Sequence, residues 1–172
     1  MLSFRKAVLV IALLSLTACG FRPLHGHTQE VSSTATDQLA LIKIEQIPDR
    51  IGQEFRNALL DRLTPKGQPS KPRYFLRVSV TETIQELGIR KDETATRANF
   101  RLHVEYALYD SITREAVFKS KKKTIGSYNI VTSDFATLTA EKDIRKRLIL
   151  KVSDNIKTSL AIHLSRHNLA VR

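Results

Sequence analysis

The sequence is short of the residues that cross-link or anchor many small domains. It has no tryptophan, one methionine and one cysteine in 172 residues. A single cysteine excludes an intramolecular disulfide. Because tryptophan is absent and methionine occurs once, the core must be built from Leu, Ile, Val, Phe and Tyr. The length allows one compact domain. The composition excludes collagen, low-complexity disorder and a polytopic membrane protein.

Acidic residues are also scarce. Asp and Glu number 17 against 28 Lys and Arg, which gives a formal net charge of +11 and a pI of about 10.0. Such an imbalance favours an anionic partner, which is a nucleic acid, an anionic lipid or a phosphorylated glycolipid. The charge alone does not choose among these classes.

The sequence lacks the motifs of the common catalytic and nucleotide-binding sites. It contains no H-E-x-x-H, no phosphate-binding loop, no G-x-S-x-G and no dinucleotide fingerprint. Two pairs of histidines are closely spaced, His25 with His27 and His163 with His167, but neither pair has an acidic or thiolate ligand nearby in sequence. We therefore expect neither an enzyme nor a metal or other cofactor.

The first 18 residues have the features of a secretory signal peptide. Arg5 and Lys6 give a positive start, and residues 7–16 are apolar apart from Ser15. This apolar run is too short to span a membrane, which takes about 20 residues, and it ends at small residues as a signal peptide does. An ordinary buried first helix is the alternative.

The only cysteine stands at the end of Leu16-Thr17-Ala18-Cys19, which resembles the bacterial lipobox. The resemblance implies cleavage before Cys19 and attachment of acyl chains, palmitate among them, to that residue. At about 0.8 kcal/mol per buried methylene, three chains anchor a protein almost irreversibly. Gly20 is not the aspartate that retains lipoproteins in the inner membrane, so the resemblance favours the periplasmic side of the outer membrane. A chance cysteine behind an ordinary signal peptide is the alternative.

Beyond the cysteine, the pattern predicts a polar, lipidated tether at 19–38, a single folded domain at 39–166 and a tail at 167–172. A strand at 39–47 precedes a helix that Asp49 can cap and that Thr64-Pro65 ends. The apolar residues of this helix recur at helical spacing and are Ile51, Phe55, Ala58, Leu59 and Leu63.

Strands with two-residue periodicity follow, and a long helix comes last. The third predicted strand has the clearest apolar face, which consists of Ala98, Phe100, Leu102, Val104, Tyr106 and Leu108. The fourth strand runs over residues 114–127. The last helix runs over residues 134–165, and its apolar stripe is made of Leu138, Leu148, Ile149, Val152, Ile156 and Leu160.

The order β-α-β-β-β-α predicts an α+β two-layer sandwich, with a four-stranded mixed sheet and two helices on one face. The first two strands should be parallel because a helix joins them. The other face of the sheet should be polar and basic.

Three groups of basic residues are candidates for binding an anion. Arg90 and Lys91 lie at the predicted tip of the hairpin between the second and third strands, where a scaffold often presents binding groups. Arg97 and Arg101 share one face of the third strand with His103. Three lysines share one face of the fourth strand: Lys119, Lys121 and Lys123. A solvated surface that protects an edge strand explains these lysines equally well.

The chain resembles LptE, the lipopolysaccharide-assembly lipoprotein family, and in particular its alphaproteobacterial branch. The resemblance covers nearly the whole chain, and the predicted order of strands and helices fits it. Besides the lipobox, it is carried by Cys19-Gly20-Phe21-Arg22-Pro23-Leu24, by Ser127-Tyr128-Asn129 and by Phe135-Ala136-Thr137-Leu138-Thr139-Ala140-Glu141-Lys142-Asp143.

The resemblance implies a non-enzymatic role. Members of the family sit as a plug inside the large β-barrel LptD, assist its assembly, and bind lipopolysaccharide on its way to the outer leaflet. The family places a lipopolysaccharide-binding basic residue in the loop between its second and third strands, and Arg90 occupies that place. Lys142 in the last helix is a weaker candidate for a second contact. Asp92 and Glu93 offset part of the charge of the loop.

Two other functions are open. An auxiliary lipoprotein of a lipid-transport ATPase can have a similar topology, and it would co-purify with transport components rather than with a barrel. A nucleic-acid-binding module would explain the charge, but the signal peptide argues against it, and the few aromatic residues of the strands mostly face the core instead of forming a stacking platform. We therefore expect the LptD barrel, lipopolysaccharide and the membrane as partners, and no nucleic acid.

Overall fold

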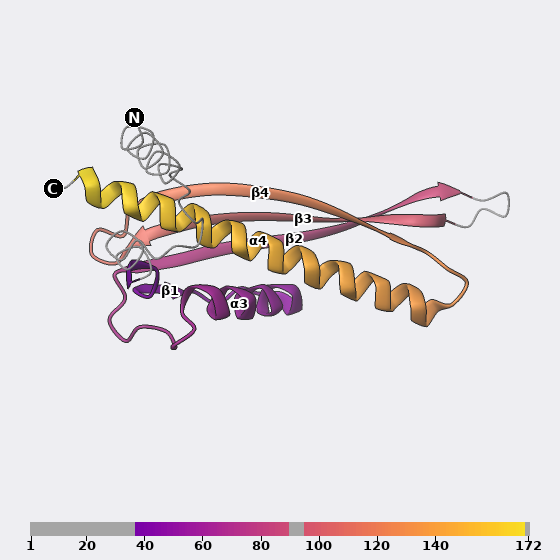
Figure 1. Cartoon of the computed structure of the whole chain (residues 1–172), viewed down its shortest axis with the longest axis horizontal. Helices are drawn as coiled ribbons and strands as arrows, with labels where there is room; N and C mark the ends of the chain where they lie inside the picture. Colours follow the sequence, from indigo (N-terminus) through magenta and orange to yellow (C-terminus); the bar gives the residue numbers. More distant parts are fainter. Residues whose placement is uncertain (1–36, 90–94, 171–172) are drawn as a thin grey trace, which may run out of the picture. The chain divides into compact units, whose positions relative to one another are not determined.

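The computed structural model describes residues 37–89 and 95–170, and of residues 89, 95 and 167–170 it describes the backbone only. Within these residues the elements are β1 (Ile42–Ile44), α3 (Asp49–Leu63), β2 (Tyr74–Ile89), β3 (Ala95–Asp110), β4 (Ala116–Asn129) and α4 (Asp134–Ala170). Their order confirms the predicted β-α-β-β-β-α (Figure 1). The predicted signal peptide, the tether up to residue 36 and the hairpin tip at 90–94 lie outside the described residues.

The strands form one mixed sheet in the order β1-β2-β3-β4. β1 pairs with β2 in parallel, with Ile42 opposite Tyr74, as expected for two strands joined through a helix. β3 pairs antiparallel with both β2 and β4. β1 covers only the first three residues of β2, and β4 forms the other edge of the sheet.

Even-numbered residues of β2, β3 and β4 form the inner face of the sheet, which contacts the helices. The predicted apolar face of β3 is confirmed, because every one of its side chains from Ala98 to Leu108 is at most 3% exposed. The neighbouring strands continue this face with Leu76 on β2 and Tyr128 on β4, both buried. Alternation over three long strands therefore builds one continuous apolar surface.

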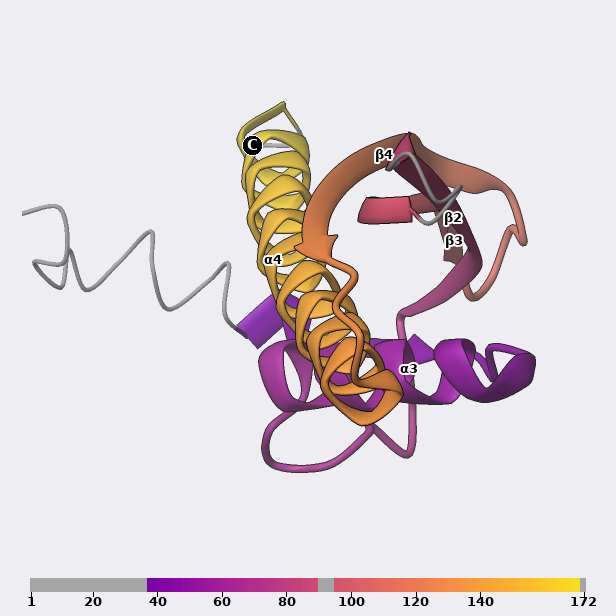
Figure 2. The same ribbon diagram turned by 90° about the vertical axis from the view of Figure 1, so that its right-hand side faces the viewer.

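Both helices pack on the inner face, which confirms the two-layer sandwich (Figure 2). α3 buries Phe55, Leu59 and Leu63, as the spacing predicts, and ends at Leu63 before Thr64-Pro65. α4 approaches β4 so closely at Gly126 that a Cβ there would overlap the side chain of Ile144. Glycine at this inner-face position therefore allows the helix and the strand to come into contact.

The first strand and the helix cap differ from the prediction. The strand at 39–47 shortens to Ile42–Ile44, because residues 37–39 are helical and the pairing with β2 ends with the hydrogen bond from the Glu45 N–H to the Leu76 carbonyl. Asp49 is not a side-chain cap: α3 begins at Asp49 itself, its N-cap is Pro48, and the cap makes no side-chain hydrogen bond. Asp49 instead has a positive φ of 67°.

α4 is longer than predicted and begins to bury its apolar residues later. Leu148, Ile149, Val152, Ile156 and Leu160 are buried as expected, but Leu138 is 53% exposed. The first buried apolar side chain of α4 is Ile144. Leu138 lies in the first turns of α4, ahead of the part of the helix that packs on β4, so helical spacing alone placed it wrongly.

Ion pairs fasten α4 to its neighbours on the inner side of the sheet. Arg145 bonds the Glu82 carboxylate of β2 (Nε to Oε2, 2.9 Å) and that of Glu141 one turn earlier in α4 (Nη2 to Oε1, 2.9 Å). Arg62 of α3 pairs with Asp154 of α4. In the part of the chain that the structure describes, no helix is both long and apolar enough to cross a membrane.

Candidate anion-binding face

Odd-numbered residues of β2, β3 and β4 form the outer face of the sheet, opposite the helices. Both the exposure and the charge of these residues confirm that this face is polar and basic. Its cationic side chains are Arg77 on β2, Arg97 and Arg101 on β3, and Lys119, Lys121 and Lys123 on β4. The single carboxylate on the same strands and face, within the described residues, is that of Glu105.

Strand register arranges these residues in rows across the sheet. One row places Ala107 between Arg77 and Lys119. The next row places Glu105 between Ser79 and Lys121, so the Lys121 ammonium lies 2.8 Å from the Glu105 carboxylate. The small side chains of Ser79 on β2 and Ala107 on β3 thus stand beside the long cationic side chains of Arg77, Lys119 and Lys121.

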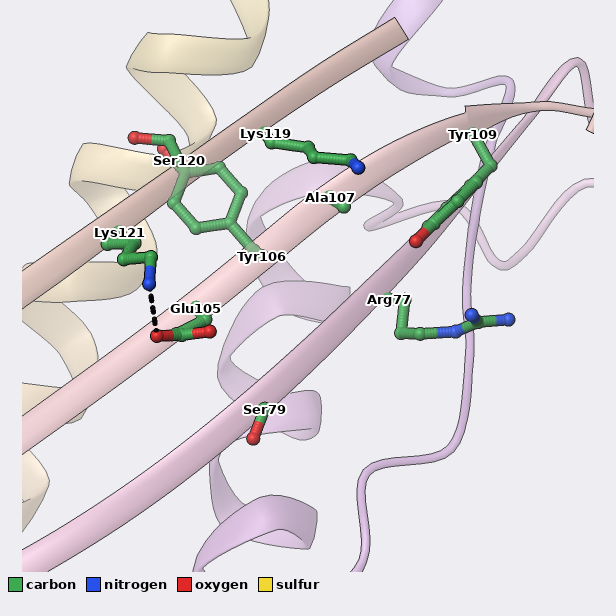
Figure 3. Close-up of a pocket in the computed structure, with 9 residues that line it drawn as sticks. All are labelled: Arg77, Ser79, Glu105, Tyr106, Ala107, Tyr109, Lys119, Ser120 and Lys121. Atoms are coloured by element: carbon green, nitrogen blue, oxygen red, sulfur yellow. Dashed lines mark ion pairs between the residues drawn. The ribbon is translucent and has the colours of Figure 1, made fainter. Parts of the chain in front are cut away.

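These two rows form a hollow of about 380 Å³ on the outer face (Figure 3). Ala107 and Ser79 are small and leave the space open above the sheet. Lys119 extends from β4 toward β3, and Tyr109 extends from β3 toward β2 with its hydroxyl foremost. The guanidinium group of Arg77 lies 4.9 Å from the centre of the Tyr109 ring, within cation–π range.

Charges around the hollow are partly neutralised within the protein. Arg77 bonds the Glu45 carboxylate at 2.9 Å, and this hydrogen bond together with the charge of Glu45 raises the pKa of Arg77 above its ordinary value. The hydrogen bond and charge of Lys121 lower the pKa of Glu105 from its ordinary value. Lys119 makes no ion pair with any described residue, so its ammonium is the cation available to a ligand.

The structure gathers five of the predicted site residues on the outer face: Arg97, Arg101, Lys119, Lys121 and Lys123. β3 rises about 3.4 Å per residue, so the basic band from Ala107 to Arg97 extends for about 34 Å. β4 is an edge strand, and edge protection therefore also explains its lysines.

The other predicted site residues are not part of this face. Arg90, Lys91 and Cys19 lie outside the described residues. Lys142 is exposed on α4, which packs on the opposite side of the sheet, so the structure does not bring it together with the cations of the strands.

Sequence reasoning missed Arg77, Tyr109 and Ala107 as neighbours of Lys119. Alternation alone places each of them on the outward side of its own strand, but the row that they share depends on strand order and register. The signal that was present in the sequence is the small residue Ala107, which stands between two larger outward residues, Glu105 and Tyr109.

Titratable residues in the described part of the chain do not assemble into a metal site. No group of three or more His, Cys, Asp or Glu side chains there is close enough to hold an ion. His103 illustrates this: its Nε2 lies 3.7 Å from Glu105, and its neighbour on β4 is Lys123, a cation.

Comparisons with known proteins find the fold but no sequence family. The sequence matches no protein-family model and no curated protein. Among solved structures, it is similar to a protein of Caulobacter crescentus CB15 described as a lipoprotein, with a TM-score of 0.63 and 24% identity over 77% of this chain and 97% of that one.

Two further structures share the same arrangement. Rare lipoprotein B from Shewanella oneidensis has a TM-score of 0.56 and 15% identity, over 75% of this chain and 96% of that one. A minor lipoprotein from Acinetobacter baumannii has a TM-score of 0.55 and 21% identity, over 70% of this chain and 90% of that one. All three of these proteins are lipoproteins, which agrees at the level of the fold with the lipoprotein family that the sequence resembles. The described domain thus has the fold of these lipoproteins of Gram-negative bacteria.

Proposed function

We propose that this protein is an outer-membrane lipoprotein that is anchored through Cys19, plugs and helps to assemble the LptD β-barrel, and binds lipopolysaccharide during its delivery to the outer leaflet. The observation that carries the proposal is the outer face, where six cationic side chains meet one carboxylate on three long strands. Lipid A carries phosphates, which arginine and lysine side chains bind strongly.

Two further observations support the proposal. The fold is that of several bacterial lipoproteins, rare lipoprotein B among them. The outer face is free of both helices, so a large amphipathic ligand could reach it without unfolding the domain. Arg90 and Lys91 follow directly on β2 and belong to the proposed binding region by their sequence position.

A charge-reversal pair tests lipopolysaccharide binding. In the first variant Lys119, Lys121 and Lys123 all become glutamate. In the matched control three exposed lysines of α4 become glutamate: Lys146, Lys151 and Lys157. Both variants change the net charge equally, so a difference between them reports location and not overall charge.

We expect the first variant to lose about tenfold or more in affinity for purified lipopolysaccharide, because charge-assisted hydrogen bonds to phosphate are lost. The control should stay within about threefold, since its changes act only through the long-range field. Circular dichroism must show both variants folded. Equal losses in the two variants would contradict binding at the outer face.

A second experiment tests the barrel partner. The tagged, lipidated protein is purified from detergent-solubilised outer membranes, and its partners are identified by mass spectrometry. A stoichiometric β-barrel that survives high salt is the expected result. Recovery of transport-ATPase components in place of a barrel would instead favour the auxiliary-lipoprotein function.

Anchoring is tested by Cys19→Ala. Without an acylated cysteine, the protein should be recovered in the soluble periplasmic fraction instead of the membrane fraction. Normal membrane recovery of this variant would contradict the anchor.

A further inference from the structure

The hollow beside Tyr109 has features that the rest of the outer face lacks. Arg97, Arg101 and Lys123 stand along the strands as separate cations, but the hollow is lined by an aromatic ring, a carboxylate and an ammonium that has no ion pair with a described residue (Figure 3). Cationic side chains alone would be enough to bind a phosphate. A ring and a carboxylate add the means to bind a group that carries hydroxyls.

Each wall of the hollow suits a different part of one ligand. Lys119, which has no ion pair with a described residue, offers its charge to an anionic group. Glu105 accepts hydrogen bonds with the carboxylate oxygen that Lys121 leaves free, and the lowered pKa of Glu105 keeps that oxygen ionised. Tyr109 adds a hydroxyl and an aromatic edge next to Arg77.

Size restricts the ligand further. At about 380 Å³ the hollow lies near the small end of the roughly 300–1,000 Å³ that ligand pockets span. Its floor is low only because Ala107 and Ser79 are small, and a larger side chain at either position would fill it. The space therefore suits one sugar ring with its substituents better than an oligosaccharide or an acyl chain.

The geometry points to a binding subsite for an acidic monosaccharide unit, with Lys119 holding the anionic group and Tyr109 and Glu105 holding the sugar ring. This inference rests on the proposed function: it names the sugar-phosphate part of the glycolipid head group as what the hollow binds. The acyl chains and the remaining phosphates would contact other parts of the protein.

The test uses small probes on the mature protein in detergent. N-acetylglucosamine 1-phosphate is compared with N-acetylglucosamine and with inorganic phosphate, and binding is followed by backbone amide NMR shifts of β3 and β4 around Ala107 and Lys119. We expect the sugar phosphate to bind at least tenfold more tightly than either part alone, with shifts centred on the hollow. Equal binding of inorganic phosphate would overturn the sugar assignment, and shifts centred elsewhere would overturn the site.

Two pairs of variants localise the effect. Lys119→Gln should weaken binding of the sugar phosphate about tenfold, because a charge-assisted hydrogen bond is lost. Lys146→Gln, on α4 at the opposite side of the sheet, should leave this binding within about twofold. Ala107→Leu should abolish binding by filling the floor, whereas Thr83→Leu, elsewhere on the outer face, should not. Equal effects within either pair would overturn the inference.

Failure of this inference is distinguishable from failure of the proposed function. If lipopolysaccharide binds the wild-type protein and the sugar phosphate does not, the hollow is not a subsite but the function stands. If the sugar phosphate binds at the hollow and lipopolysaccharide does not, the subsite stands and the function is wrong. Binding of neither probe overturns both.

Discussion

The two faces of β3 have opposite properties although they alternate along one strand. From Ala98 to Leu108 the inner residues are apolar and at most 3% exposed. Between them the outer residues carry Arg101, His103 and Glu105 in contact with solvent. Because successive side chains of a strand point to opposite faces, the chain separates stability from charge residue by residue. Substitutions on the inner face should change stability, and substitutions on the outer face should change binding.

The largest effect is expected from Phe100→Ala. Phe100 is fully buried on the inner face, and the Arg145 guanidinium lies 5.2 Å from the centre of its ring. Truncation should lower the free energy of unfolding by about 3–5 kcal/mol, measured by urea denaturation. Its neighbour Arg101, exposed on the outer face, provides the control: Arg101→Ala should cost less than about 0.5 kcal/mol. Similar losses at both positions would remove the distinction between the faces.

A smaller loss is expected from Gly126→Ala, which tests the contact between β4 and α4. The added methyl group would overlap Ile144, and overpacking of this kind costs about 1–3 kcal/mol. If that overlap is the cause, Ile144→Val should recover part of the loss in the double variant. A purely additive double variant would mean that glycine serves another purpose at this position.

Arg145 is an exception to the comparison of the two faces, because it is a charged residue on the inner, apolar side of the sheet. Arg145→Met leaves the Glu82 and Glu141 carboxylates without their partner, and both are only partly exposed. The expected loss is about 1–3 kcal/mol in denaturant unfolding. Glu82→Gln with Arg145→Met should lose less than Arg145→Met alone, because one unpaired carboxylate is gone. An equal or larger loss would show that the ion pair itself stabilises the domain.

The smallest effect concerns Glu105, on the outer face. Lys121 lowers the pKa of Glu105 in the folded protein from its ordinary value, chiefly by a hydrogen bond and also by its charge. A lowered pKa contributes stability above the unfolded pKa, and this contribution disappears as the pH falls through the folded pKa. The melting temperatures of wild type and Glu105→Gln should therefore differ at pH 7 and converge as the pH falls from 5 toward 3. A difference that stays constant with pH would contradict this assignment.

Most of the sheet could be predicted because its signal is local. Alternation over residues such as Phe100 and Leu102 fixes both the strand and its buried face, and helical spacing fixed Phe55 and Leu59 equally well. Leu138 shows the limit of such local patterns. Its spacing fits the apolar stripe, but whether this turn of α4 is buried depends on how far the part of the helix that packs on the sheet extends. The predicted side-chain cap at Asp49 was wrong for a related reason. The positive φ of Asp49 depends on the whole connection from β1 and not on the residue type.

The candidate site was predictable only in part. The shared face of Lys119, Lys121 and Lys123 follows from two-residue periodicity within one strand. The row of Arg77, Ala107 and Lys119 combines three strands, so it requires the register of each pair. A one-residue slip would place Ala107 on the inner face and remove the hollow, and no local pattern in the sequence specifies which outward residues become neighbours.

Sheet order also has a consequence for how the chain folds. β2, β3 and β4 are neighbours in sequence as well as in the sheet, so their many backbone pairings close through short connections. β1 pairs with β2 only after the chain has passed through α3, with Ile42 opposite Tyr74, and each such closure costs loop entropy before it gains contacts. We expect the three-stranded meander to be formed in the folding transition state and β1 to join afterwards. Folding and unfolding rates of Val104→Ala and Ile42→Val would show it: the first change should mainly slow folding, and the second should mainly speed unfolding.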